Sequence, residues 1–194
     1  MANITTVSES AKQQLLKELR GLTQADSLNR EKRNDALGGG ADAIEPELNY
    51  AFPIAKITDL ESNALEESGS NLIPVELNGD VIGFMVASEE PALGGAAKPS
   101  ILLQPTKSQN EKFKRAVEMA RDNFGNEYRI IVFEHRPLQL KAVVLVSDKD
   151  KKYVIYQASR KLSKDWVLPI LIEEDDFYLL IRQSKPISGI TDNN

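Results

Sequence analysis

YRIIVFEHRPLQLKAVVLVSDKDKKYVIYQA, residues 128–158, is the strongest structural signal in the chain. It contains three apolar runs rich in β-branched residues, separated by two polar breaks. Runs of this kind, bounded by turn residues, are typical of strands, and short breaks join antiparallel neighbours. The stretch therefore predicts a three-stranded antiparallel meander over residues 128–134, 138–147 and 152–158, at the centre of the core.

A hairpin and a helix are predicted to complete the sheet domain. Alternating apolar residues over residues 72–87 flank Asn78-Gly79, which suits a type I′ turn because both positions then need positive φ. Over residues 109–124, apolar side chains recur at helical spacing. We therefore predict an α+β fold, in which an antiparallel sheet made of the meander and the hairpin packs on one amphipathic helix. The same order of elements is compatible with an OB-like barrel.

The flanking segments are less regular. An amphipathic helix is predicted over residues 8–20, on a flexible arm. Residues 50–57 are predicted to form an edge strand or an extended arm around Pro53, and residues 58–67 a short helix. Residues 166–172 and 177–181 are predicted to be strands, joined by an acidic turn over residues 173–176. The predicted organisation is an N-terminal helix (1–22), a linker (23–49), a single α+β domain (50–186) and a polar tail (187–194).

Composition excludes several chemistries. The chain has no cysteine and a single histidine, His135. Thiolate catalysis, cysteine-ligated zinc and a histidine-rich metal site within one chain are therefore excluded. Neither a secretory signal nor an apolar run of about 18 residues is visible. We expect no catalytic residue, no cofactor, no metal and no membrane partner, and a location in the cytoplasm or in a particle assembled there.

Charge is distributed unevenly along the chain. Residues 41–104 contain two basic and eleven acidic side chains, whereas residues 105–165 contain fourteen basic and eight acidic ones. This split favours an assembly in which the acidic part of one copy meets the basic part of another. A basic platform for nucleic acid and two solvated faces without a partner are the alternatives.

Basic and aromatic residues alternate after the meander turn. Single-strand binders combine cations that follow the backbone with rings on which bases stack. Tyr153 and Tyr156 should point to opposite faces of a strand, so at most one of the two rings can line such a platform. The predicted surface for nucleic acid or a protein partner comprises Lys149, Lys151, Lys152, Tyr156, Arg160, Lys161, Lys164 and Trp166.

Two weaker patterns lie within the meander. Glu134 followed by Gln139 and Lys141 resembles the order of acid and acid-x-lysine in a divalent-metal nuclease of the PD-(D/E)xK type, although glutamine is a poorer Mg²⁺ ligand than a carboxylate. His135 has no partner motif that indicates catalysis.

The leading functional hypothesis is a non-enzymatic structural or interaction subunit of a larger assembly, for which a virus or phage particle would be a fitting context. Extended arms and complementary charged surfaces would hold it to other protein chains. The alternative hypothesis is a nucleic-acid-binding module, and the third is the divalent-metal nuclease.

Overall fold

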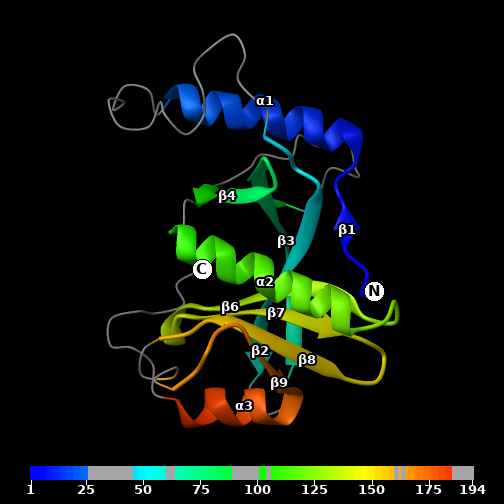
Figure 1. The fold of residues 1–194 in the computed structure, drawn as a ribbon, viewed down its shortest axis with the longest axis vertical. Coiled ribbons are helices and arrows are strands. Elements are labelled where there is room, and N and C mark those ends of the chain that lie inside the picture. The colour runs from blue at the N-terminus through cyan, green and yellow to red at the C-terminus, as the bar shows by residue number, and fades with distance from the viewer. Residues whose placement is uncertain are drawn as a thin grey trace. The chain divides into compact units, whose positions relative to one another are not determined.

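A computed structural model describes residues 1–25, 46–59, 64–88, 101–103, 106–159, 162 and 165–184 (Figure 1). The chain forms two compact units: unit 1 is made of residues 1–5, 52–70 and 105–194, and unit 2 of residues 6–51 and 71–104. Two strands, β2 (Tyr50–Asp59) and β3 (Ala64–Leu77), run through both units. The predicted division into helix, linker, domain and tail stays a prediction.

The predicted meander forms the centre of unit 1. Its strands are β6 (Arg129–His135), β7 (Leu140–Val146) and β8 (Lys151–Gln157), and both neighbouring pairs are antiparallel. A short 3-10 helix, Arg136–Leu138, joins β6 to β7. On one side, β6 pairs in parallel with β2, and on the other side β8 pairs antiparallel with β9 (Ile170–Glu173). The order β3-β2-β6-β7-β8-β9 is open, so the OB-like barrel is wrong.

Helices cover both faces of this sheet, whereas the sequence predicted one helix. Helix α2 (Lys107–Asn123) and helix α3 (Glu174–Gln183) lie on opposite sides of β6–β8 in Figure 1. Alternation along β8 explains this: Tyr156 packs on Phe113 of α2, while Tyr153 stacks on Phe177 of α3. Because successive side chains of a strand point to opposite faces, a strand that is apolar at every position requires a cover on each face.

Helix α2 is close to its predicted bounds. Thr106 caps it, and the Thr106 and Gln109 side chains form a reciprocal capping box with each other's backbone amide groups. This arrangement satisfies amide donors that a helix N-terminus otherwise leaves without a partner. The buried side of the helix follows the predicted apolar spacing through Phe113, Ala116 and Ala120.

Four local predictions are wrong. Residues 174–176, predicted as part of an acidic turn, form the first turn of α3. Residues 177–181 belong to α3 rather than to a strand, because Phe177, Tyr178 and Ile181 pack together on the sheet at helical spacing. The described part of residues 58–67 is extended, at the end of β2 and the start of β3. Strand β2 is not an edge strand, since it lies between β3 and β6 in the pairing order, and Pro53 is buried.

Unit 2 has its own apolar core. Helix α1 (Glu9–Ala25) contributes Leu15 and Leu19, which pack with Ile73, Val75 and Met85 of the predicted hairpin. The hairpin consists of β3 and β4 (Asp80–Ser88), and its turn has φ 53° at Asn78 and φ 79° at Gly79, which confirms the turn prediction. Strand β5 (Ile101–Leu103) pairs antiparallel with β4.

The N-terminus of the chain belongs to unit 1. A two-residue strand, β1 (Thr5–Thr6), pairs with β2, and Asn3 bridges to Arg129 at the start of β6. Most of the predicted linker, residues 89–100 and the polar tail lie outside the described residues.

Candidate interaction surface around strands β8 and β9

Two of the predicted surface lysines are engaged in ion pairs within unit 1. Lys151 Nζ lies 2.6 Å from Glu174 Oε1, and Lys152 Nζ lies 2.6 Å from Glu173 Oε2. Both carboxylates belong to β9 or to the first turn of α3, so these lysines pair β8 with the elements that follow it. Lys149, in the turn before β8, is exposed.

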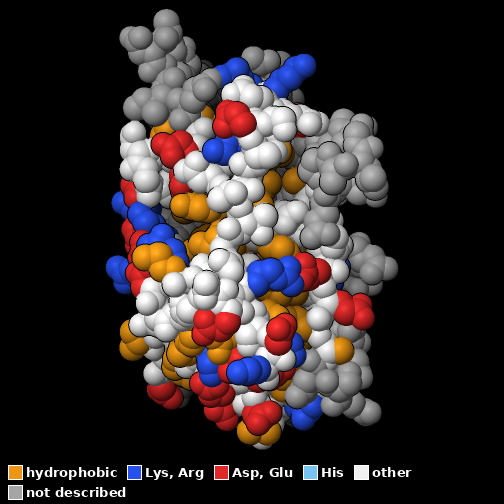
Figure 2. Space-filling model, turned by 90° about the vertical axis from the view of Figure 1, so that its right-hand side faces the viewer, with side chains coloured by type: hydrophobic (Ala, Val, Ile, Leu, Met, Phe, Trp, Pro, Cys, Tyr) orange, Lys and Arg blue, Asp and Glu red, His pale blue; other side chains and the backbone are white. Residues whose placement is uncertain are grey.

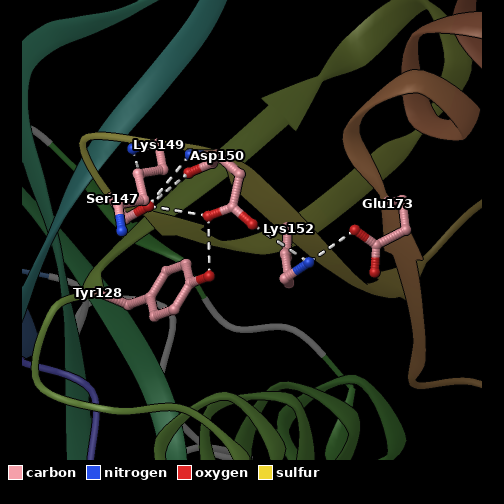
Figure 3. A network of polar contacts seen from close by, with 6 residues as sticks. All are labelled: Tyr128, Ser147, Lys149, Asp150, Lys152 and Glu173. Atoms are coloured by element: carbon pink, nitrogen blue, oxygen red, sulfur yellow. Dashed lines mark hydrogen bonds and ion pairs between the residues drawn. The ribbon is translucent and has the colours of Figure 1, made fainter.

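A polar network closes the turn between β7 and β8 (Figure 3). Tyr128 Oη and Ser147 Oγ each donate to Asp150 Oδ1 at 2.8 Å. Ser147 Oγ accepts hydrogen bonds from the backbone amides of Lys149 and Asp150 at 3.2 and 3.1 Å. Lys152 Nζ lies 3.3 Å from Asp150 Oδ2, so the lysine connects this turn to Glu173.

The network shifts the titration of its members. The hydrogen bond from Tyr128 and then the one from Ser147 lower the pKa of the Asp150 carboxyl, because they stabilise its charged form. The same Asp150 bond raises the pKa of Tyr128, and the bond to Glu173 raises the pKa of Lys152. All three groups are therefore in the protonation state that the network needs at neutral pH. A structural role in fixing the β7–β8 turn accounts for these contacts.

The aromatic members of the predicted surface are enclosed. Tyr156 is 6% exposed and Tyr153 is fully buried, and burial raises the pKa of both phenols. Neither ring presents a face on which a base could stack, whereas the sequence left one of the two available. Trp166 is partly buried against the cluster that α3 forms with the sheet. The remaining basic residues of the predicted surface lie outside the described residues: Arg160, Lys161 and Lys164.

The nuclease-like pattern is brought together only in part. Glu134 and Lys141 are cross-strand partners, with Lys141 Nζ 3.3 Å from Glu134 Oε1. Gln139 is exposed and lies in the left-handed region, with φ 51°, at the end of the 3-10 helix. The lysine thus neutralises the acid across the strand pair. Within the described ranges, no group of three or more His, Asp or Glu side chains could hold a metal ion.

His135 closes strand β6. Its ring lies parallel to that of Phe133, with 6.4 Å between the ring centroids and 22° between the planes. The His135 imidazole therefore packs against Phe133, an aromatic residue of the core.

The sequence prediction missed three exposed apolar side chains, Val167, Leu171 and Leu179. Their exposed fractions are 88%, 37% and 50%, and among the described residues Met1 is the other large hydrophobic side chain that is exposed. Leu171 lies opposite Val154 of β8, on the face of the sheet away from α3, whereas Leu179 belongs to α3 and Val167 precedes β9. Acidic residues in the first turn and an apolar repeat after them are typical signals of a helix start, and they could have identified α3.

The two helices of unit 1 differ in charge. Helix α2 has five basic and three acidic side chains, whereas α3 has three acidic side chains and one basic one. Asp175 and Asp176 are exposed and form no ion pair with the described residues. The face in Figure 2 shows basic and acidic side chains interspersed, with hydrophobic surface between them. Opposite charge therefore lies on the two helices that cover opposite faces of the sheet.

Comparisons with known proteins found no matching family model, no significantly similar curated protein and no significantly similar solved structure. Among the helices in the described ranges, none is both long and apolar enough to cross a membrane.

Proposed function

We propose that this chain is a non-enzymatic interaction subunit of a larger protein assembly. The observation that supports the proposal is the exposed side chain of Leu171 on β9, the last described strand in the pairing order, with exposed Val167 just before that strand. Water-exposed apolar side chains favour contact with another protein, because burying them is favourable by about 25 cal/mol per Å².

The charges at the end of β9 and the start of α3 fit the same role. Glu173 and Glu174 are neutralised by Lys152 and Lys151, whereas Asp175 and Asp176 remain exposed next to Leu179. An apolar centre bordered by polar and charged groups is the usual composition of a protein interface. Exposed acids at the border of such a surface raise the rate of encounter with a basic partner surface.

Two experiments test this proposal, one by cross-linking and one by substitution. We expect cross-linking mass spectrometry on native complexes to join lysines of a partner to Asp175 or Asp176. Substituting Val167 and Leu179 by serine should reduce the amount of complex severalfold, since it removes apolar area without touching the core. The matched control is Ser10→Ala, an exposed change in α1. A full-length chain that stays monomeric and forms no stoichiometric complex in native extract would refute the proposal.

A virus or phage particle would be one such assembly. In that case, the full-length chain should co-sediment with intact particles at a fixed copy number. If the chain is recovered only from the unsedimented fraction, it is not a component of such a particle. Membership of another assembly would still be tested by the cross-linking experiment.

A nucleic-acid-binding module is the second proposal, and the basic side of α2 favours it. Lys107 and Arg115 of this helix are exposed, and Lys149 is exposed in the β7–β8 turn. With the tyrosine rings buried, affinity would come from phosphate contacts, so binding should fall steeply with salt. The combined change Lys107→Ala and Arg115→Ala should then weaken retention on single-stranded DNA or RNA in 50 mM salt. No retention of the unmodified chain under those conditions would eliminate this alternative.

A further inference from the structure

Strand β9 is an open edge of the sheet in unit 1. It is the last strand in the pairing order, and among the described strands it pairs only with β8, through Lys152–Glu173, Tyr153–Ile172, Val154–Leu171 and Ile155–Ile170. Such a strand has one row of backbone amide and carbonyl groups directed away from its neighbour. These groups can bind a further strand.

Strand β9 is short, with four residues after Pro169, but it has no charged side chain in its middle. Its one charged side chain is Glu173, at the end of the strand, and the carboxylate is neutralised by Lys152 at 2.6 Å. The middle of the strand is Ile170, Leu171 and Ile172, of which Leu171 is 37% exposed. An apolar edge strand without an inward-pointing charge is favourable for pairing with another chain.

We propose that β9 pairs antiparallel with β9 of a second copy of this chain, about a two-fold axis that passes through Leu171. This inference rests on the proposed function and names the partner. The sequence of β9 suits such an axis, because Ile170-Leu171-Ile172 reads the same in both directions. Each Ile170 then lies opposite Ile172 of the partner copy, and the two Leu171 side chains lie side by side.

The acidic residues after β9 determine the direction of pairing. In the antiparallel arrangement, Glu173 lies opposite Pro169, and Glu174 lies opposite Leu168, so the acids of the two copies are kept apart. A parallel arrangement would place Glu173 of one copy opposite Glu173 of the other and would bring the acidic first turns of both α3 helices to the same end. Like charges directly opposite each other are destabilising in a strand pair, so parallel pairing is disfavoured. A two-fold interface also closes on itself and yields a dimer rather than a fibre.

The absence of cysteine from the chain allows a direct test with the full-length protein. On a two-fold axis at Leu171, the two engineered sulfurs of Leu171→Cys face each other across strands whose Cα atoms are about 4.5–5.5 Å apart. That separation lies within the range that a disulfide spans. Under mild oxidation, Leu171→Cys should form a covalent dimer about tenfold or more faster than the exposed control Ser10→Cys, because pairing raises the local thiol concentration.

A second variant tests the same contact without oxidation. Leu171→Asp places two carboxylates at the axis, so sedimentation equilibrium should show a monomer where the unmodified chain and Ser10→Asp are dimeric. Circular dichroism of Leu171→Asp checks that the exposed substitution leaves the fold intact. Equal cross-linking of Leu171→Cys and Ser10→Cys, or an unmodified chain that is monomeric up to about 200 µM, would overturn the pairing.

The outcomes separate this inference from the proposed function. A chain that is monomeric alone, yet forms a stoichiometric complex with a different protein, overturns the self-pairing of β9 and retains the interaction role. A chain that is monomeric and also forms no complex overturns both. A dimer that survives Leu171→Asp would place the contact between copies elsewhere and would overturn the assignment to β9.

Discussion

Strands β7 and β9 are both apolar segments of the same sheet, yet they differ sharply in exposure. Residues 142–145 of β7 are all fully buried, whereas in β9 Leu171 is 37% exposed and Ile170 and Ile172 are only partly buried. The difference follows from position, because β7 has a strand on each side, whereas β9 pairs among the described strands with β8 alone. Apolar composition therefore does not decide burial by itself; the number of neighbours decides it.

The comparison also separates stability from interaction. Side chains of β7 stabilise the monomer because their contacts exist whether or not a second chain is present. The exposed side of β9 contributes little to the monomer, and its apolar area becomes useful only when another surface covers it. The following predictions test this difference, from the largest expected effect to the smallest.

Phe177→Ala should have the largest effect, because α3 covers one face of the sheet through this ring. Phe177 stacks on Tyr153 with 3.7 Å between the ring centroids and contacts Phe133 edge to face at 5.3 Å. We expect the free energy of unfolding to fall by about 3–5 kcal/mol in urea titrations. Phe177→Leu is the control and should lose clearly less. Equal losses would mean that the aromatic stack is not what holds α3.

Leu145→Ala tests the interior of β7 directly. This side chain is fully buried, and the substitution should lower the free energy of unfolding by about 2–5 kcal/mol through lost transfer energy and a cavity. The measurement is chemical unfolding at a protein concentration at which the unmodified chain is monomeric. A loss below about 1 kcal/mol would show that the sheet collapses around the cavity and would weaken the contrast with β9.

The turn between β7 and β8 should make the free energy of unfolding sensitive to acid pH. The pKa of Asp150 is lowered in the folded state, so its contribution to stability is present above the unfolded carboxyl pKa, about 3.9, and is lost as the pH falls through the folded pKa. Asp150→Asn should flatten the fall in stability below about pH 4. If the stability of the variant falls with acid pH as steeply as that of the unmodified chain, other carboxyl groups cause the fall.

The pKa of Lys152 is raised mainly by its bond to Glu173, so the stability from this pair is present at neutral pH and is lost as the pH rises through the folded lysine pKa. The pair is partly exposed, with side chains 18% and 62% accessible. A double-mutant cycle with Lys152→Met and Glu173→Gln should therefore give a coupling of only about 0.2–1 kcal/mol. A coupling above this range would mean that the ion pair, rather than the backbone ladder, holds β9 to β8.

Leu171→Ala should have the smallest effect on the monomer, about 0.5 kcal/mol or less, because the side chain is already exposed. The same substitution should weaken dimerisation measurably at high protein concentration. The informative comparison is with Leu145→Ala, since both remove the same atoms from strands of one sheet. A loss of monomer stability close to that of Leu145→Ala would break the distinction between the two strands.

Much of the architecture was predictable from local patterns. The meander, the Asn78-Gly79 hairpin and α2 each have a signal contained within a few consecutive residues, namely alternation, turn chemistry and a capped helical repeat. The segment 177–181 was misread because a short apolar run suits a strand and a helix equally, and the acids before it were interpreted as a turn. The position of β2 was missed because parallel pairing with β6 joins residues far apart in the chain.

The candidate surface was less predictable than the fold. The sequence indicated that lysines gather along β8, but it could not show that Lys151 and Lys152 are neutralised by Glu174 and Glu173, because those partners arrive only when β9 pairs with β8. It indicated that one tyrosine would be buried, but it could not show that a second helix buries the other. The exposure of Leu171 had no sequence signal, since this residue is as apolar as any core leucine.

The amino-acid sequence by itself determined the α+β class, the antiparallel meander and the absence of cysteine chemistry, because these depend on composition and on contacts between near neighbours. The tertiary structure alone decided that both faces of the sheet are covered, that the lysines of β8 are paired, and that β9 is left as the edge. The physical reason is that exposure and ion pairing depend on which segments distant in sequence meet. Strand β7 and strand β9 have similar residues, and only their neighbours make one a core and the other a surface.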